Sequence, residues 1–158
     1  MGRTRGCLWL TAGLVVAILA GLEAASNEIA QLTGTHCPVF EIDITDESSV
    51  ERAAEFVKKQ AGKLDILVNN AAVGRGNTPL EDTELDEWND TIQTNLTGTF
   101  LCMKHFCRMM IAQRSGKVIN LASMAGMVAL QDSCLGAYDC SKAAIECLTR
   151  CMAGEWAQ

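Results

Sequence analysis

Tyr138 and Lys142 lie four positions apart in the stretch AYDCSKAAI, residues 137–145. On an α-helix, residues at this spacing share a face about one turn apart. The Lys142 ammonium would then lie near the Tyr138 phenol and, by favouring the phenolate, lower the pKa of the tyrosine from its usual value of about 10. Such a tyrosine could exchange a proton with a carbonyl or an alcohol near neutral pH. The same spacing also occurs by chance in ordinary helices, so the surrounding elements must decide between the two interpretations.

Short apolar segments alternate with helical patterns along the chain. Apolar strands are predicted at 14–19, 38–44, 64–68 and 117–121. Helices are predicted at 22–32, from Thr45 or Asp46 to Gly62, through 84–112 with a break near Gly98, and at 137–156. Strands this apolar, alternating with helices, indicate a parallel sheet covered on both faces, in one doubly wound α/β domain.

Polar residues follow the predicted strands at the points where such a sheet binds its ligands, outside the carboxyl ends of the strands. Asp43 lies at the end of the segment 38–44, one residue before its last, NNAA (69–72) follows 64–68, and Ser123 follows 117–121. The helix that carries the tyrosine and the lysine comes next. We therefore expect these groups to meet at one edge of the sheet.

Composition excludes several classes of function. The 158 residues suffice for one domain with a core, and an apolar content of 49% indicates a globular chain. The net charge of −6 argues against a nucleic-acid partner or an anionic-membrane surface. With eight cysteines but no CxxC pair, and only two histidines, no metal site is expected. Cys147 and Cys151 lie four apart on a predicted helix, a spacing seldom used for disulfides, and the cysteines are expected to be reduced, small apolar side chains.

The first 25 residues have two interpretations. Two arginines precede an uncharged run from Gly6 to Leu22, and small residues follow, which is the pattern of a signal peptide or a short membrane anchor. The alternative is that LVVAIL (14–19) is a buried strand, which we favour because the strand–helix alternation continues after it. The strand interpretation predicts a cytoplasmic protein; the other predicts one secreted or membrane-anchored through residues 1–25.

Four segments occur in order and at suitable distances: LDILVNNAA (64–72), TNLTGTF (94–100), INLASMAG (119–126) and AYDCSKAA (137–144). Together they resemble the short-chain dehydrogenase/reductase family, from about residue 14 to the end of the chain. The resemblance implies a Rossmann-like fold and hydride transfer between NAD(H) or NADP(H) and a small-molecule carbonyl or alcohol. It also implies homo-oligomers that associate through the helices matching 84–112 and 137–156.

The resemblance implies roles for four catalytic residues. Tyr138 would be the general acid in ketone reduction and the general base in alcohol oxidation, while Lys142 would lower its pKa and hydrogen-bond the nicotinamide ribose. Ser123 would hold the substrate oxygen and offset the charge that develops on it. Asn95 would help to order a proton-relay water near the lysine. The structural alternatives are a hydroxyl bonded to its own backbone for Ser123 and a helix-kink residue for Asn95.

The resemblance also implies a set of cofactor-binding residues: Asp43, Ile44, Asn69, Ala71, Ala72, Tyr138 and Lys142. Asp43 and Ile44 resemble the family's adenine contact, and the segment from Asn69 to Ala72 resembles the turn along the adenosine ribose. Ala72 stands where the family more often has glycine. For Asn69 the alternative is turn formation. No charged residue stands at the turn after LVVAIL, so NAD and NADP are not distinguished.

Two parts of the family pattern are missing. The family begins with a strand, a TGxxxGxG loop and a helix that bind the pyrophosphate, and residues 1–13 have no such spacing. Members also continue past the catalytic helix with further strands, whereas this sequence ends at Gln158. The sequence therefore predicts an incomplete Rossmann-like domain at 14–158 after a non-matching segment at 1–13, with unpaired strand edges where the first strand would lie.

Two functions are open from the sequence. The first is an NAD(P)-dependent oxidoreductase; the second is a catalytically inactive fragment that acts, if at all, by association with a full-length partner. Tyr138 follows Ser123 by 15 residues, after an SMAG stretch. This is similar to some polyol- and sugar-reducing members of the family and indicates a sugar alcohol or a ketose as the substrate.

Overall fold

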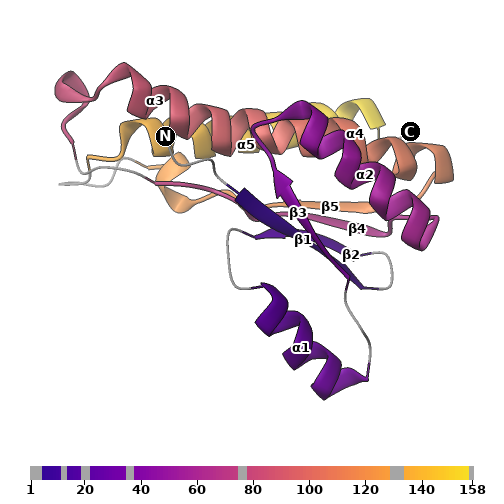
Figure 1. The fold of residues 1–158 in the computed structure, drawn as a ribbon. Helices are drawn as coiled ribbons and strands as arrows, with labels where there is room; N and C mark the ends of the chain where they lie inside the picture. Colours follow the sequence, from indigo (N-terminus) through magenta and orange to yellow (C-terminus); the bar gives the residue numbers. More distant parts are fainter. Residues whose placement is uncertain are drawn as a thin grey trace.

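The structure, a computed structural model, describes residues 5–11, 14–18, 22–34, 38–74, 78–128 and 134–156. Five strands form one sheet in the order β3-β1-β2-β4-β5 (Figure 1). Their bounds are β1 (Arg5–Thr11), β2 (Leu14–Ile18), β3 (Val39–Asp43), β4 (Ile66–Asn69) and β5 (Lys117–Asn120). The helices are α1 (Leu22–Thr33), α2 (Glu47–Ala61), α3 (Leu85–Ile92), α4 (Gly98–Gln113) and α5 (Gly136–Trp156).

The strand directions agree with the predicted parallel sheet on one side and differ from it on the other. β2, β4 and β5 run parallel, with Leu14 opposite Ile66 and Ile66 opposite Lys117. β1 lies within 1–13, where the sequence predicts no element, and runs antiparallel to both β2 and β3. The domain boundary after residue 13 stays a prediction.

The expectation of unpaired edges beside the strand at 14–18 is wrong. β2 pairs directly with β4 on one side and with β1 on the other. The physical reason is that a buried strand must satisfy its backbone N–H and C=O groups, and neighbouring strands supply the partners. The strand interpretation of 14–19 is confirmed for Leu14–Ile18. No helix in the described ranges has the length and apolar character needed to cross a bilayer.

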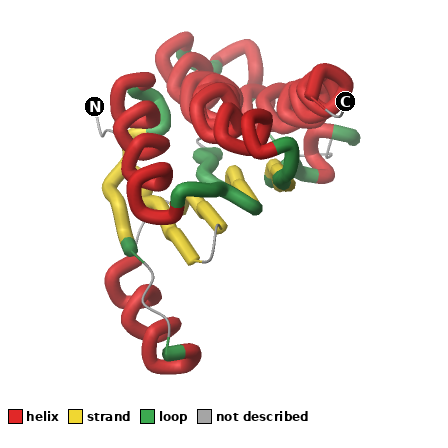
Figure 2. Tube along the Cα trace, turned by 90° about the vertical axis from the view of Figure 1, so that its right-hand side faces the viewer, coloured by secondary structure: helices red, strands yellow, loops and turns green. Residues whose placement is uncertain are grey.

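Helices cover the sheet on both sides. Figures 1 and 2 show α1 on the opposite side of the sheet from α2, α4 and α5. A core of fully buried side chains lies between the sheet and the second group of helices, and includes Ile42, Val57, Leu67 and Phe106. The doubly wound α/β architecture predicted from the sequence is thereby confirmed.

Local signals in the sequence set the ends of α2. The Asp46 carboxylate accepts a hydrogen bond from Ser48 N at 3.0 Å and caps the amino end. Gly62 ends the helix with φ of 68°, a conformation that glycine adopts without strain. Both ends agree with the prediction.

The break predicted near Gly98 is a π-helical segment, Gln93–Thr97, which joins α3 to α4 without ending the helix. A Cβ at Gly98 would lie 2.8 Å from Ile44 Cδ1, so the glycine allows α4 to approach the end of β3 closely. Because π-helical turns are rare and occur mostly at functional sites, this segment singles out the residues that it carries.

Candidate active site

Tyr138 and Lys142 face the same side of α5, as their spacing predicts. The Lys142 Nζ lies 5.5 Å from the centroid of the Tyr138 ring. The lysine is only 3% exposed, and its Nζ donates a hydrogen bond to Leu121 O at 2.6 Å, just beyond the carboxyl end of β5. Burial lowers the pKa of Lys142 from its ordinary value. The geometry therefore sets a buried amine beside a half-buried phenol.

Asn95 lies in the π-helical segment and is fully buried. Its Oδ1 accepts a hydrogen bond from Val73 N at 2.8 Å, and its Nδ2 donates to Val73 O at 2.8 Å and to Ser141 Oγ at 2.9 Å. Ser141 Oγ in turn donates to Tyr138 O at 2.7 Å. One amide thus ties the loop after β4 to the first turn of α5, which agrees with a positioning role. The water-ordering role predicted for Asn95 stays a prediction.

The loop held by Asn95 packs against the tyrosine ring. A Cβ at Gly74 would lie 3.3 Å from Tyr138 Cδ2, tighter than most contacts of that kind. The glycine therefore brings the backbone of the loop close to one face of the ring. Because Val73 is fixed by two hydrogen bonds to Asn95, this wall of the site is held by the core of the protein.

Ser123 begins the short helix η3 (Met124–Gly126), and its Oγ accepts a hydrogen bond from Ala125 N at 3.2 Å. The bond to its own backbone agrees with the structural alternative. It leaves the O–H of the serine free to donate, since a hydroxyl both accepts and donates. The turn packs on α5 next to the lysine, because a Cβ at Gly126 would lie 2.6 Å from Ala143 N. The turn that begins at Ser123 therefore contacts α5 at the position of Lys142.

The residues predicted to contact the adenine lie at the end of β3. The Asp43 carboxylate accepts hydrogen bonds from Thr45 N at 2.9 Å and from Thr45 Oγ1 at 2.6 Å, which closes a tight turn. Ile44 is 2% exposed and packs toward Gly98. Ala71 is buried and Ala72 half-buried after β4. Their contacts with a cofactor stay predictions.

Asn69 is the last residue of β4 and not the first residue of the turn, which corrects the predicted end of the strand at 68. Its Nδ2 donates to Asn120 Oδ1 at 2.8 Å on the neighbouring strand. Asn120 Nδ2 donates to Thr149 Oγ1 at 2.8 Å on α5. Asn69 Oδ1 is buried and has no hydrogen-bond partner among the described residues. The side chain thus links strands to α5, and its role at the ribose stays a prediction.

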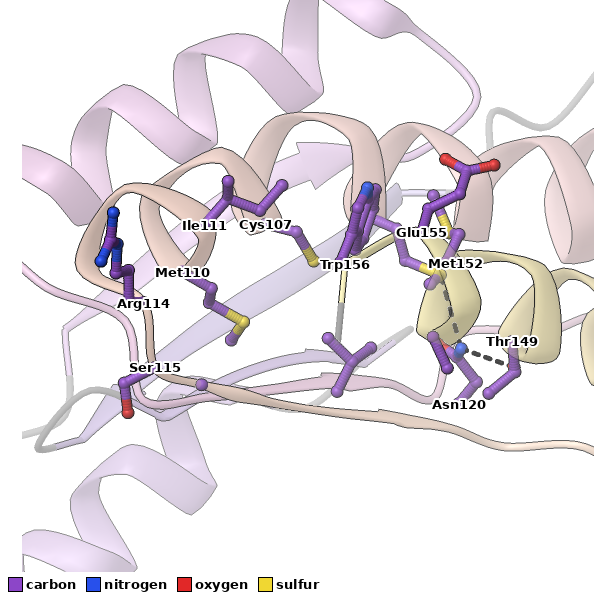
Figure 3. Close-up of a pocket in the computed structure, with 14 residues that line it drawn as sticks. Cys107, Met110, Ile111, Arg114, Ser115, Asn120, Thr149, Met152, Glu155 and Trp156 are labelled. Carbon is purple, nitrogen blue, oxygen red and sulfur yellow. Dashed lines mark hydrogen bonds between the residues drawn. The ribbon is translucent and has the colours of Figure 1, made fainter. Parts of the chain in front are cut away.

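A cavity of about 860 Å³ lies between α4, β5 and α5. Figure 3 shows its labelled lining, which includes Cys107, Met110 and Trp156, with the Asn120–Thr149 hydrogen bond at one end. None of the four predicted catalytic residues lines it. β5 pairs only with β4 in the described sheet, so the cavity lies beside a free strand edge, apart from the predicted catalytic residues.

Sequence reasoning missed several residues that position the site. Ser141 stands inside the tyrosine–lysine motif, one residue before the lysine, and that place in the motif is the signal that could have found it. Gly74 and Gly126 matter because a Cβ at either position would meet a close neighbour, the Tyr138 ring for Gly74 and the α5 backbone for Gly126, and spacing alone does not reveal these contacts. Leu121 contributes a backbone carbonyl, for which side-chain type carries no signal.

The cysteines are only partly as predicted. Cys102 and Cys107 are buried, and burial raises the pKa of each thiol to about 12. Cys140, Cys147 and Cys151 are free thiols, as predicted, but they are exposed along α5 and do not pack as small apolar side chains. These cysteines are exposed because they lie on the face of α5 that none of the other described elements covers, and helix propensity does not determine which face is covered. Among the described residues, no group of three or more His, Cys, Asp or Glu side chains could hold a metal ion.

A sheet with parallel strands, helices on both sides and polar residues at the carboxyl ends of those strands defines a Rossmann-like α/β fold. The sequence profile described as short chain dehydrogenase matches residues 8–158. The chain therefore belongs to the short-chain dehydrogenase/reductase family, an enzymatic family of NAD- or NADP-dependent oxidoreductases.

Relatives with assigned activities are similar over nearly the whole chain. An NAD-dependent glycerol dehydrogenase of Listeria innocua is 34% identical over 157 residues, which cover 99% of this chain and 61% of the relative. A galactitol 2-dehydrogenase of Rhizobium johnstonii is 34% identical and covers 92% of this chain and 58% of the relative. The chain thus spans about three-fifths of the length of these relatives.

Solved structures are similar as well. The crystal structure of an NAD+-bound xylitol dehydrogenase superposes with a TM-score of 0.82 at 33% identity, over 86% of this chain and 51% of that one. A gluconate 5-dehydrogenase from Burkholderia cenocepacia, in complex with NADP and tartrate, gives a TM-score of 0.69 at 34% identity, over 73% of this chain and 44% of that one. Both nucleotides thus occur among the structural neighbours.

Proposed function

We propose that this chain carries the proton-transfer centre of an NAD(P)-dependent oxidoreductase that interconverts a carbonyl and an alcohol. The observation that supports it most directly is the buried Lys142 amine, 5.5 Å from the centroid of the Tyr138 ring. A buried amine without a carboxylate partner among the described residues has a desolvation cost, and such costs are typical of functional sites.

The residues of the chain suit the proton half of the reaction. In the reductive direction, the Tyr138 hydroxyl gives its proton to the carbonyl oxygen as the carbon accepts hydride; in the oxidative direction, the phenolate takes the proton from the alcohol. The Lys142 ammonium stabilises the negative charge that the departing proton leaves on the phenol. Ser123 donates its O–H to the substrate oxygen while its own oxygen accepts from Ala125 N.

The hydrogen-bond donors of Lys142 support the proposal that a dinucleotide binds here. The Lys142 ammonium has three N–H donors. Among the described residues, one of them donates to Leu121 O, and the other two would donate to the ribose hydroxyls. A bound nicotinamide would supply or accept the hydride. Asp43, Ile44 and the segment 69–72 would hold the adenosine. Residues 19–21, between β2 and α1, lie outside the described residues.

A polyol or the corresponding ketose is the proposed substrate class. The sequence indicates it through the SMAG stretch and the 15-residue distance from Ser123 to Tyr138. The relatives named for glycerol, galactitol and D-threitol support it. We also propose a cytoplasmic location and homo-oligomers through 84–112 and 137–156. Phe100 and Ile111 on α4 are 40% and 49% exposed, which supplies apolar surface for such contacts.

The test compares wild type with Tyr138→Phe, which removes one hydroxyl and keeps the ring that packs on Gly74. Turnover of glycerol, galactitol and xylitol is measured with NAD and with NADP, and nucleotide binding is measured by quenching of tryptophan fluorescence. We expect the variant to lose about 100- to 10,000-fold in turnover, the usual contribution of a general acid or base. Nucleotide affinity should change by less than about threefold, since the ring and the lysine are retained.

Two results decide between enzyme and inactive fragment. Saturable nucleotide binding with turnover by wild type, lost in Tyr138→Phe, supports the proposal. Equal turnover by both proteins contradicts the role of the tyrosine. If wild type neither binds nucleotide nor turns over any polyol, the inactive-fragment alternative holds, and binding to a full-length family member becomes the property to measure.

A further inference from the structure

Two exposed thiols share one face of α5 outside the catalytic site. Cys147 and Cys151 are four residues apart on the uninterrupted helix Gly136–Trp156, so their side chains project on the same face one turn apart. No part of the proposed oxidoreductase chemistry uses them. The pair is therefore a cluster of nucleophilic, metal-binding groups without an assigned role.

Helix geometry opposes a disulfide between these cysteines. Side chains at this spacing have Cβ atoms about 5–6 Å apart, whereas a disulfide needs about 3.5–4.5 Å. An ion between the two sulfurs relaxes this demand, because two metal–sulfur bonds of about 2.3 Å separate the sulfurs by up to roughly 4.6 Å. The same helix that keeps the pair from oxidising to an internal disulfide thus leaves both sulfurs on one face, where side-chain rotation can bring them to a shared ion.

We propose that Cys147 and Cys151 form a two-sulfur binding site for a soft, thiophilic cation, with Cu(I) as the ion that fits best. Thiolates are soft ligands and select Cu(I), which accepts two sulfurs, whereas a structural zinc site requires four ligands. No third metal-binding side chain completes a cluster here among the described residues. Binding displaces the thiol protons to solvent and forms two sulfur–metal bonds without electron transfer.

Neighbouring charges act on the site in opposite directions. The neighbouring Cys147 thiol and, to a smaller extent, the Glu155 carboxylate raise the pKa of the Cys151 thiol. The same carboxylate, one turn beyond Cys151, adds negative charge that attracts a cation. The Arg150 guanidinium lowers that pKa. All of these groups are exposed in the single chain.

The same helix supplies a matched control. Cys140 is exposed on α5, but the positions four residues away from it are Gly136 and Ala144, and Cys147 on the same face is two turns away, so Cys140 has no thiol within one turn. Cys102 and Cys107 are buried, and their raised pKa keeps them protonated at neutral pH. The proposal therefore predicts binding that depends on one pair of cysteines and not on the number of cysteines.

The test is an anaerobic titration of the full chain with Cu(I) buffered by a chromophoric chelator. Wild type and Cys140→Ser should each withdraw one equivalent of Cu(I) with the same affinity, and Cys147→Ser and Cys151→Ser should each weaken binding at least tenfold, because one sulfur is lost. Equal weakening by Cys140→Ser, or unchanged binding by Cys147→Ser, would overturn the proposal. Nucleotide binding should be unchanged in all three variants, which separates this site from the proposed function.

A second measurement needs no variant. Wild type with and without one equivalent of Cu(I) is treated briefly with iodoacetamide, and the alkylated cysteines are mapped by mass spectrometry. The ion should protect Cys147 and Cys151 together and leave Cys140 as reactive as before. Protection of any other set of cysteines would place the ion elsewhere and refute the site.

Discussion

Replacing Asn95 with alanine tests whether one buried amide holds the site together. The side chain is 0% exposed and makes three hydrogen bonds, two to the backbone of Val73 and one to Ser141 Oγ. Asn95→Ala leaves the Val73 N–H and C=O and the Ser141 oxygen without this partner. The loop beside the Tyr138 ring then loses its connection to the π-helical segment.

The expected loss of stability follows from these bonds. A buried polar group that loses its partner costs about 1–3 kcal/mol. Val73 is half-buried, so water can replace part of what is lost and the lower value applies. Three bonds at about 1 kcal/mol each give a loss of roughly 3 kcal/mol in the free energy of unfolding. That is a large share of the total of about 5–15 kcal/mol typical of a domain.

Urea unfolding followed by tryptophan fluorescence measures this loss, with Thr91→Val as the matched control. Thr91 is 1% exposed on α3, and its Oγ1 has no hydrogen-bond partner among the described residues. Its replacement by an isosteric apolar residue should be neutral or stabilising. Ser141→Ala and the double variant complete a cycle, whose coupling should be about 0.5–3 kcal/mol. A loss below about 0.5 kcal/mol for Asn95→Ala, or no coupling, would refute the reasoning.

Two further predictions concern the elements next to the lysine. Gly126→Ala should destabilise the protein by about 1–3 kcal/mol through overpacking, because its Cβ would meet Ala143 N at 2.6 Å. Gly154→Ala, with open space around it, should stabilise α5 by about 0.5–1 kcal/mol. Equal effects of the two substitutions in thermal unfolding would contradict the close approach at Gly126. Lys142→Met should abolish a pH dependence of stability. Burial lowers the folded-state pKa of Lys142 below 10.5, so between the folded-state pKa and 10.5 the unfolded state binds more protons than the folded state. Unfolding titrations should therefore show wild type gaining stability relative to the variant as pH rises toward 10.5. A stability difference that stays constant with pH would contradict the burial of the charge.

The strongest sequence signals were those in which local chemistry and periodicity agree. The start of α2 at Asp46 and its end at Gly62 were predicted because a capping carboxylate and a left-handed glycine act within a few residues. The pairing of Tyr138 with Lys142 was predicted because a helix alone brings residues four apart to one face. These features need no knowledge of what packs against them.

The order and direction of the strands in the sheet could not be predicted from capping residues or short-range spacing. An apolar strand at 14–18 does not specify its neighbour, and its pairing with β4 and with the antiparallel β1 depends on which backbone groups are free in the assembled sheet. Nor did the sequence separate the buried Cys102 from the exposed Cys147, since both lie on helices and only packing distinguishes their faces.

By itself, the sequence determined the family, the α/β alternation and the catalytic helix, because each depends on residue type and short-range spacing. The tertiary structure alone decided how the site is held: Asn95 reaches Val73 across 22 positions and Ser141 across 46. Contacts at such separations depend on how the elements pack in three dimensions. A hydrogen bond to a backbone group also cannot be predicted from the type of residue that supplies the group, as the Leu121 carbonyl illustrates.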